Sequence, residues 1–279
     1  MEQLKRHNFI PSFDNVFVDP NIPATSITTI LSMLVEPFNQ QEVAEKTYNK
    51  HFNNPNSQYY QKTVSDIIAM WSAKGQESLR YGRLNDEYIG IVLEGTETDY
   101  EIYELDNDVE GDERLKTQID AFNEFINDNK DRYSYITREK TVYYRIGDQY
   151  VKGRFDALLY DNLLNKYVVV DWKTSGVVET ERTQWTSKML GAAKEFDALN
   201  WNSYTMQVYF YKTALIESGY LLPGTTVNDI DVVIVNFPGK KFPDGKLYRM
   251  YNEAFEYNKE TIDKILTFGI KKNAILNRK

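Results

Sequence analysis

One ten-residue stretch, KYVVVDWKTS at positions 166–175, constrains the fold of this chain more than any other segment. Its apolar and aromatic residues run directly into Asp171, Trp172 and Lys173. A short apolar run rich in β-branched residues predicts a buried strand. Buried strands do not normally end in unpaired charges. We therefore expect the charges at this end to pair with other groups or to have a functional role. Alternation along a strand places Asp171 and Lys173 on the same face of the sheet.

Two more β-type stretches precede this strand, YITREKTVYYRIG at 135–147 and QYVKGRFDALLYD at 149–161. Turn residues separate the three stretches, so we predict three consecutive strands joined as hairpins. Asp156 lies on the second strand, fifteen residues before Asp171. That separation suits an antiparallel hairpin in which the two carboxylates converge at one end.

Apolar residues at spacings of three and four predict the helices of the chain. In the front half, after an irregular arm over 1–24, the predicted helices are 25–37, 40–52 and 63–94. Behind the three strands, the pattern predicts a helix at 200–218, strands at 229–238 and 245–253, and an amphipathic helix at 252–272. We therefore expect an α/β protein with a mainly helical region over 1–130 and a core over 131–279.

The absence of cysteine excludes disulfides, thiolate catalysis, cysteine-ligated zinc and iron-sulfur clusters. With 279 residues and 42% hydrophobic content, the chain can bury a sizeable core. No run of 18 or more apolar residues occurs, and the first residues do not resemble a secretory signal. We expect a soluble cytoplasmic protein with no membrane partner.

A net charge of −8 argues against a nucleic-acid partner at first sight, because phosphate binding relies on Lys and Arg. Residues 97–113, however, carry nine carboxylates and no basic residue, which leaves the rest of the chain at +1. The rest of the chain, which is nearly neutral, can therefore still form a basic groove. We expect the acidic stretch itself to be a solvated hairpin or loop.

Two converging carboxylates with a neighbouring ammonium group are suited to metal-assisted hydrolysis of a phosphodiester. The carboxylates of Asp156 and Asp171 are hard oxygen ligands of the kind that Mg²⁺ and Mn²⁺ prefer. Lys173 would orient or deprotonate the attacking water. The alternative is an interstrand Asp–Lys salt bridge on an exposed face, and a D-x-K triplet taken alone fits that alternative better.

The triplet is accompanied by two other motifs, in the order Gly153-x-x-Asp156, Asp171-x-Lys173 and Gln207-x-x-x-Tyr211. Over residues 64–235 this order resembles the PD-(D/E)XK nuclease superfamily, in particular its RecB-like exonuclease branch. The resemblance implies a restriction-endonuclease-like core, with a central mixed β-sheet flanked by helices, and an α-helical N-terminal part that forms an arch or channel. Without cysteines, the chain is similar to cluster-free members, such as phage-encoded and mitochondrial genome-maintenance exonucleases.

The resemblance also assigns roles to single residues. It implies that Asp156 and Asp171 are catalytic and bind the metal, that the main-chain carbonyl of Trp172 is a further ligand, and that Lys173 serves the nucleophilic water. These assignments imply one or two Mg²⁺ or Mn²⁺ ions and no iron-sulfur cluster.

Gln207 and Tyr211 share one helix face, and the resemblance implies that this face supports the active site and contacts the DNA backbone. Ordinary helix packing is the alternative. The family usually carries G-x-x-x-H in a preceding helix, where the best match here ends in Asp86. Asp86 is then a candidate metal ligand, with Glu87 as a rival. Glu139 would reach a second metal or be a surface glutamate.

The leading hypothesis is a stand-alone, metal-dependent DNA exonuclease that acts on single-stranded DNA ends. A structure-specific or sequence-specific endonuclease would use the same metal centre. A non-catalytic DNA-binding or assembly protein on a nuclease fold is the third hypothesis, and the intact Asp156, Asp171 and Lys173 argue against it. The expected partners are DNA and proteins of replication or recombination, and a viral origin is suggested.

Overall fold

The computed structural model describes residues 3–8, 11, 13, 16–94, 109–174, 176, 178–184 and 186–277, with the backbone alone for 109–112. The chain divides into two compact units, one formed by Pro37–Glu87 and the other by Met1–Glu36 together with Tyr88–Lys279. The expected division into a mainly helical region over 1–130 and a core over 131–279 stays a prediction. Met1–Glu36 belongs to the larger unit, in which short strands near the start of the chain pair with strands of the second half.

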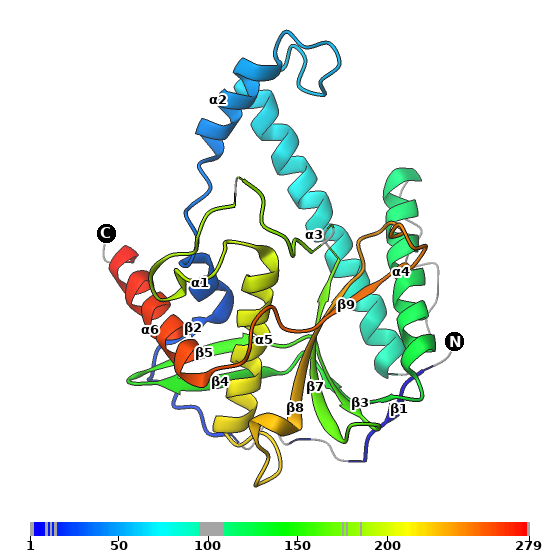
Figure 1. Cartoon of the computed structure of the whole chain (residues 1–279), viewed down its shortest axis with the longest axis vertical. Helices are drawn as coiled ribbons and strands as arrows, with labels where there is room; N and C mark the ends of the chain where they lie inside the picture. Colours follow the sequence, from blue (N-terminus) through cyan, green and yellow to red (C-terminus); the bar gives the residue numbers. More distant parts are fainter. Residues whose placement is uncertain are drawn as a thin grey trace. The chain divides into compact units, whose positions relative to one another are not determined.

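Helices predominate before residue 130, a run of strands follows, and helices and strands are mixed in the last third of the chain (Figure 1). The α-helices are α1 Ile27–Ser32, α2 Gln40–His51, α3 Val64–Glu94, α4 Val109–Asn129, α5 Asn200–Glu217 and α6 Lys259–Leu276, with 3-10 turns at Gly191–Ala193 and Val227–Asp229. The strands are β1 Lys5–Arg6, β2 Ala24–Ser26, β3 Tyr133–Arg138, β4 Thr141–Ile146, β5 Gln149–Arg154, β6 Ala157–Asp161, β7 Lys166–Lys173, β8 Ile230–Asn236 and β9 Arg249–Tyr251.

The larger sheet has six strands in the order β1-β3-β6-β7-β8-β9. It is mixed, because β7 pairs antiparallel with β6 and parallel with β8. The predicted central mixed sheet of an α/β fold, flanked by helices, is therefore confirmed. The predicted strand at 166–175 forms β7, an interior strand with two neighbours, which explains its nearly continuous apolar sequence. A smaller sheet has the order β2-β5-β4.

Side chains of β7 alternate between two helical layers. Val169 lies in one apolar cluster with Phe210 of α5. Trp172 points to the opposite face, where its ring lies 5.9 Å from that of Phe122 and 5.5 Å from that of Phe125, both of α4. The helices α5 and α4 therefore cover opposite faces of the larger sheet (Figure 1). By the same alternation, Asp171 and Lys173 face α5.

The predicted strands at 135–147 and 149–161 are wrong in one respect, because each divides into two. The first becomes β3 and β4, the second β5 and β6, and in both cases the chain passes from one sheet to the other. At the first passage Glu139 has a left-handed backbone with φ of 49°, which interrupts the strand. Its N–H donates to the carbonyl of Asp156 across the second passage at 3.2 Å. Asp156 thus lies at a bend between two sheets.

The other predicted elements differ from the helices and strands of the structure mainly at their ends. The predicted helix at 25–37 shortens to α1, which begins after the N-cap Ser26, whose side chain accepts from the N–H of Thr29. The predicted helix at 252–272 begins later, as α6, after the N-cap Asn258. The strand predicted at 245–253 contracts to β9. In the arm predicted to be irregular, β1 and β2 pair with β3 and β5.

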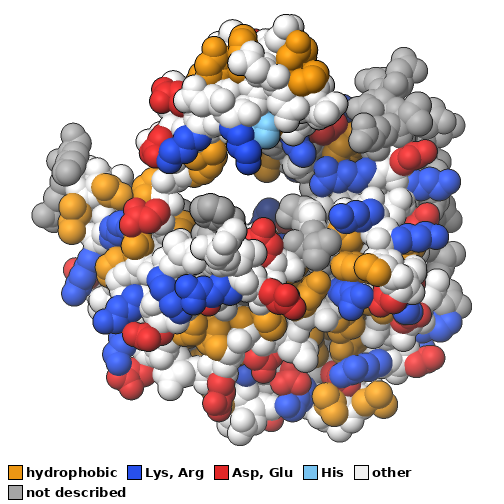
Figure 2. All heavy atoms as spheres, turned by 45° about the horizontal axis from the view of Figure 1, so that its top comes forward, with side chains coloured by type: hydrophobic (Ala, Val, Ile, Leu, Met, Phe, Trp, Pro, Cys, Tyr) orange, Lys and Arg blue, Asp and Glu red, His pale blue; other side chains and the backbone are white. Residues whose placement is uncertain are grey.

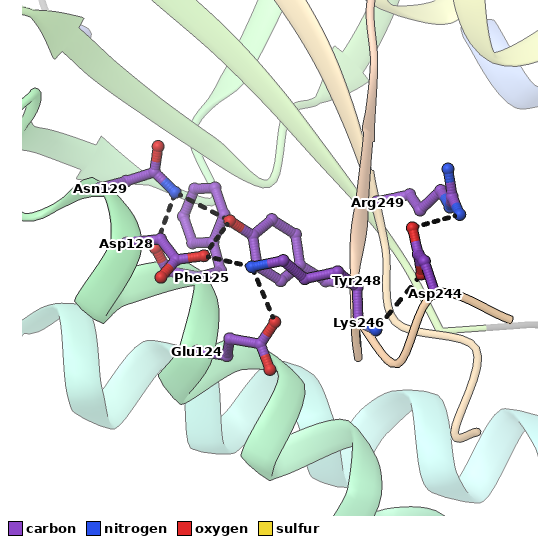
Figure 3. A network of polar contacts seen from close by, with 8 residues as sticks. All are labelled: Glu124, Phe125, Asp128, Asn129, Asp244, Lys246, Tyr248 and Arg249. Atoms are coloured by element: carbon purple, nitrogen blue, oxygen red, sulfur yellow. Dashed lines mark hydrogen bonds and ion pairs between the residues drawn. The ribbon is translucent and has the colours of Figure 1, made fainter. Parts of the chain in front are cut away.

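A network of hydrogen bonds and ion pairs connects α4 to the segment that leads into β9 (Figure 3). Asp128 accepts from the hydroxyl of Tyr248 at 3.0 Å and pairs with Lys246 at 3.3 Å. Asn129 donates to the same tyrosine oxygen at 3.3 Å, and Glu124 lies 3.6 Å from Lys246. Since α4 covers the ring of Trp172, this network stabilises the layer behind the end of β7.

Residues 95–108, most of the acidic stretch, lie outside the described residues. Its last residues, from Val109, are helical as the beginning of α4, so they do not form the expected hairpin or loop. A membrane-spanning segment is not found among the described helices, each of which is too short or too polar for one.

Candidate active site

Asp156 and the end of β7 are joined directly. Ala157, the first residue of β6, pairs with Val170, so the residue before it lies beside the end of β7. There Oδ2 of Asp156 accepts a hydrogen bond of 2.6 Å from the main-chain N–H of Trp172. The structure thus places both aspartates at the same end of the β6–β7 hairpin.

Asp171 and Lys173 form an ion pair of 2.5 Å between Oδ2 and Nζ. The side chain of Asp171 is only 1% exposed and that of Lys173 16%. Within the described part of the chain, Oδ2 of Asp171 is buried against the ammonium group of Lys173. A buried carboxylate oxygen that faces a cation is a candidate ligand atom for a metal ion.

Lys173 lies between the aspartates and an aromatic ring of α5. Its Nζ is 4.3 Å from the centre of the Tyr204 ring, a distance at which a cation and an aromatic face attract. Burial lowers the pKa of Lys173, but the charges of Asp171 and Asp156 outweigh it and raise that pKa above its ordinary value. In the absence of other cations the lysine is therefore protonated.

Gln207 and Tyr211 are brought together and support the approach to Asp156. The amide of Gln207 donates to the hydroxyl of Tyr211 at 2.9 Å, and that hydroxyl donates to the carbonyl of Arg154 at 2.8 Å. Tyr211 is 1% exposed, and burial, followed by the charge of Asp171, raises its pKa. The phenol therefore holds the end of β5 in place, while its expected contact with DNA stays a prediction.

Gly153, the first residue of the G-x-x-D motif, permits a close approach between β5 and α5. A Cβ atom at this position would lie 2.7 Å from the ring of Tyr211 and 2.8 Å from both Phe210 and Ile27. Such distances are too short for ordinary packing, so a larger residue would displace the helix or the strand. The glycine is thus explained by packing, three residues before Asp156 at the bend.

The two further acidic candidates have different surroundings. Glu139 pairs with Arg154 at 3.0 Å. Asp86 lies on α3 in the unit Pro37–Glu87, whereas Asp156 and Asp171 belong to the other unit. Over the residues that the structure describes, no cluster of three or more His, Cys, Asp or Glu side chains is arranged to hold a metal ion. The ligand role of Asp86 therefore stays a prediction, as does a second metal at Glu139.

The donor set of the site fits a hard divalent cation. Two carboxylates supply anionic oxygens, and Oδ2 of Asp171 is buried beside the ammonium group of Lys173. The carbonyl of Lys173 accepts from the N–H of Phe237 on the β8 side at 2.7 Å. Because successive residues of a strand direct their peptide groups to opposite sides, the peptide groups of Trp172 point towards Asp156. Three oxygens of this kind, with water, suit Mg²⁺ or Mn²⁺.

Buried amides hold the end of β7 just beyond the site. Gln118 of α4 donates to the carbonyl of Thr174 at 2.6 Å, and Asn236 of β8 donates to the carbonyl of Lys173 at 2.9 Å. Both amides are 0% exposed. Sequence reasoning did not single out either residue, because their partners lie far away along the chain.

Tyr204 was also missed as a neighbour of Lys173. An aromatic residue beside the Gln207 motif can stack on bases or pack in the core, and neither role predicts a contact with Lys173. A signal was present, because Tyr204 lies three residues before Gln207 and seven before Tyr211, on the same face of a helix.

Comparison with known proteins leaves the family open. No protein-family model matches the chain, and no curated protein matches it. In structure the chain is similar to the crystal structure of a "putative exonuclease" from Eubacterium rectale. That likeness covers 88% of this chain and 86% of the other, with 11% sequence identity and a TM-score of 0.43. A likeness of this extent does not identify a function, so the role of the site must be argued from its own residues.

Proposed function

We propose that this protein is a metal-dependent nuclease that hydrolyses phosphodiester bonds in DNA, and that it acts as an exonuclease on single-stranded ends. One observation carries the proposal: Asp156, Asp171 and Lys173 meet at one end of the β6–β7 hairpin, where Oδ2 of Asp171 is buried against the ammonium group of Lys173. The order of the three sequence motifs supports the choice of chemistry.

The alternative, a salt bridge on an exposed face, does not account for the burial of this pair. Asp171 is 1% exposed, and taking a carboxylate and an ammonium group out of water costs free energy that their attraction often fails to recover. A contribution to stability therefore explains the burial of this pair poorly. A role in a catalytic centre that excludes water explains it better, because charges interact more strongly where water is excluded.

The chemistry of each residue indicates its proposed role. Asp156, Asp171 and the carbonyl of Trp172 would hold Mg²⁺ or Mn²⁺. A divalent cation, when bound, neutralises charge on the reacting phosphate and makes water a stronger nucleophile at neutral pH. Lys173 would donate hydrogen bonds from Nζ to the attacking water or to a phosphate oxygen. The ring of Tyr204 would hold that ammonium group in place.

The charge of the surface is compatible with a DNA partner. Basic and acidic side chains are interspersed over the visible face of the molecule (Figure 2). The carboxylates of the 97–113 stretch account for the negative net charge of the sequence. Local basic groups can therefore bind phosphates although the whole chain is acidic.

The test is hydrolysis of end-labelled DNA in the presence of Mn²⁺. Purified protein should shorten linear single-stranded DNA from its ends and spare circular single-stranded DNA. Asp171→Ala and Lys173→Ala should each lower the rate by at least about 100-fold, whereas Lys264→Ala, at an exposed site on α6, should not. Cleavage of the circle would favour an endonuclease. Intact DNA with the parent protein, or equal rates in all variants, would contradict the proposal.

A further inference from the structure

A pocket with a volume of 430 Å³ opens beside the candidate active site. Its walls come from β4, β5, the junction of β2 with α1, and α5. Seven of its residues carry hydroxyl groups or positive charges, namely Ser26, Thr28, Thr141, Tyr143, Lys152, Arg154 and Tyr211. The amide of Gln207 adds a further donor, and none of the residues that line the pocket is acidic.

The strands explain why these donors gather. Lys152 and Arg154 lie two residues apart on β5, so they share a face of the smaller sheet. In the neighbouring strand, Tyr143 is paired with Lys152 and Thr141 with Arg154. On the other side of β5, Ser26 of β2 is paired with Lys152. The strands β2 and β4 therefore contribute hydroxyl groups on either side of the two cations of β5.

The two cations differ in their availability. Arg154 is held by Glu139 at 3.0 Å, and its side chain is 61% exposed. Lys152 is exposed and makes no ion pair with any described residue. As a residue that lines the pocket, Lys152 can therefore pair with an anion that enters it, and the hydroxyl groups can donate to the same anion.

We propose that this pocket binds a phosphate group of the nucleic-acid strand whose neighbouring phosphate reacts at Asp156 and Asp171. The proposal rests on the proposed nuclease function for the identity of the strand. Arg154 lines the pocket and lies two residues before Asp156, and its carbonyl is held by Tyr211, another residue of the pocket. One strand of nucleic acid can therefore lie across both places.

Binding can be measured without hydrolysis. The parent for this experiment is the Lys173→Ala variant in EDTA, with a fluorescent single-stranded oligonucleotide followed by anisotropy. Lys152→Gln should weaken binding about tenfold and lower the slope of log Kd against log salt by about 0.7, as expected for the loss of one phosphate contact. The matched control Lys264→Gln removes an exposed lysine of α6 and should change Kd less than about twofold.

The phosphate can come from a chain end or from within the strand, and oligonucleotides with a 5′-phosphate, a 3′-phosphate or neither distinguish these sources. A terminal phosphate is supported if it strengthens binding to the parent and not to Lys152→Gln. An internal phosphate is supported if all three oligonucleotides lose affinity equally in that variant. Inorganic phosphate should compete with the oligonucleotide in the parent more strongly than chloride at equal ionic strength.

The proposal is overturned if Lys152→Gln and Arg154→Gln, both folded by circular dichroism, bind as tightly as Lys264→Gln. This outcome is independent of the nuclease test. A hydrolytically active wild-type protein, with binding unchanged by both substitutions in the Lys173→Ala parent, would remove the pocket and keep the nuclease. Weakened binding with an inactive wild-type protein would keep a phosphate pocket and remove the nuclease.

Discussion

The main-chain N–H of Trp172 donates a hydrogen bond of 2.6 Å to Oδ2 of Asp156. Through this bond the bend between two sheets is attached to the end of β7, where Asp171 and Lys173 lie. The bond has both a structural and a chemical consequence, because the same carboxylate is proposed to bind a metal ion.

Two substitutions of Asp156 should separate these consequences. Asp156→Asn keeps an oxygen that can accept from Trp172, whereas Asp156→Ala leaves that N–H without its acceptor. We expect Asp156→Ala to lower the free energy of unfolding by about 1–3 kcal/mol and Asp156→Asn to lower it less. Both should lose binding of Mn²⁺. Urea unfolding and isothermal titration measure the two effects, and equal stability of the two variants would contradict the role of the hydrogen bond.

Lys173→Ala and Asp171→Asn should differ in metal binding. The lysine is expected to act on water and phosphate, so Lys173→Ala should keep its affinity for Mn²⁺ and lose roughly 10²–10⁴-fold in turnover. Asp171→Asn removes a charged ligand and should weaken both. Isothermal titration with Mn²⁺, combined with single-turnover hydrolysis, measures this difference. The assigned roles fail if both variants lose metal equally.

Tyr204 should act as a positioning residue for Lys173. Tyr204→Leu removes the aromatic face that lies 4.3 Å from Nζ, whereas Tyr204→Phe keeps it. A cation–π contact of about 1 kcal/mol corresponds to roughly a fivefold loss in kcat. We expect this loss in Tyr204→Leu with an unchanged KM, and recovery in Tyr204→Phe. A change in KM alone, or the same loss in both variants, would be inconsistent with this role.

Gly153→Ala should destabilise the protein. The added methyl group would meet Tyr211, Phe210 and Ile27 at 2.7–2.8 Å, so we expect a loss of about 1–3 kcal/mol in the free energy of unfolding. At Gly75, inside α3, an added methyl group would meet no heavy atom within 4 Å. Gly75→Ala should therefore be neutral or stabilising. Denaturant unfolding compares the two, and an unaffected Gly153→Ala would show that β5 and α5 are less tightly packed.

The stability of the protein should depend on the ionisation of Asp161. Burial raises the pKa of Asp161, but hydrogen bonds from Arg132 and from the N–H groups of Leu164 and Leu163 outweigh it and lower that pKa below its ordinary value of 3.8. The stability that the carboxylate contributes is therefore fully present above pH 3.8 and is lost as the pH falls towards the lowered folded-state value.

Asp161→Asn tests this dependence. The variant should be less stable than the parent by about 1–3 kcal/mol at pH 7, because the ion pair with Arg132 is lost. The difference should shrink below pH 3.8 as the parent carboxylate becomes protonated. Urea unfolding between pH 7 and the acid range measures it. A difference that does not change with pH would show that the charge is not responsible.

Local patterns in the chain were sufficient to predict several features. Alternation along β7 places Asp171 and Lys173 on one face, and helical spacing places Gln207 next to Tyr211. The hairpin register brings Asp156 to the same end as Asp171. Each of these relationships depends on strand or helix geometry over a few residues or on one short connection, so it can be derived without knowledge of the rest of the molecule.

Tertiary structure decided the features that depend on distant contacts. Neither the left-handed Glu139 nor the passage of its strand between two sheets has a local periodic signal. The contact of Gln118 with Thr174 and the burial of Asp171 depend on how α4, β7 and α5 pack together. Gly153 meets α5 only because the smaller sheet lies against that helix. Burial and side-chain contacts are properties of the packed layers, and residues remote in sequence supply them.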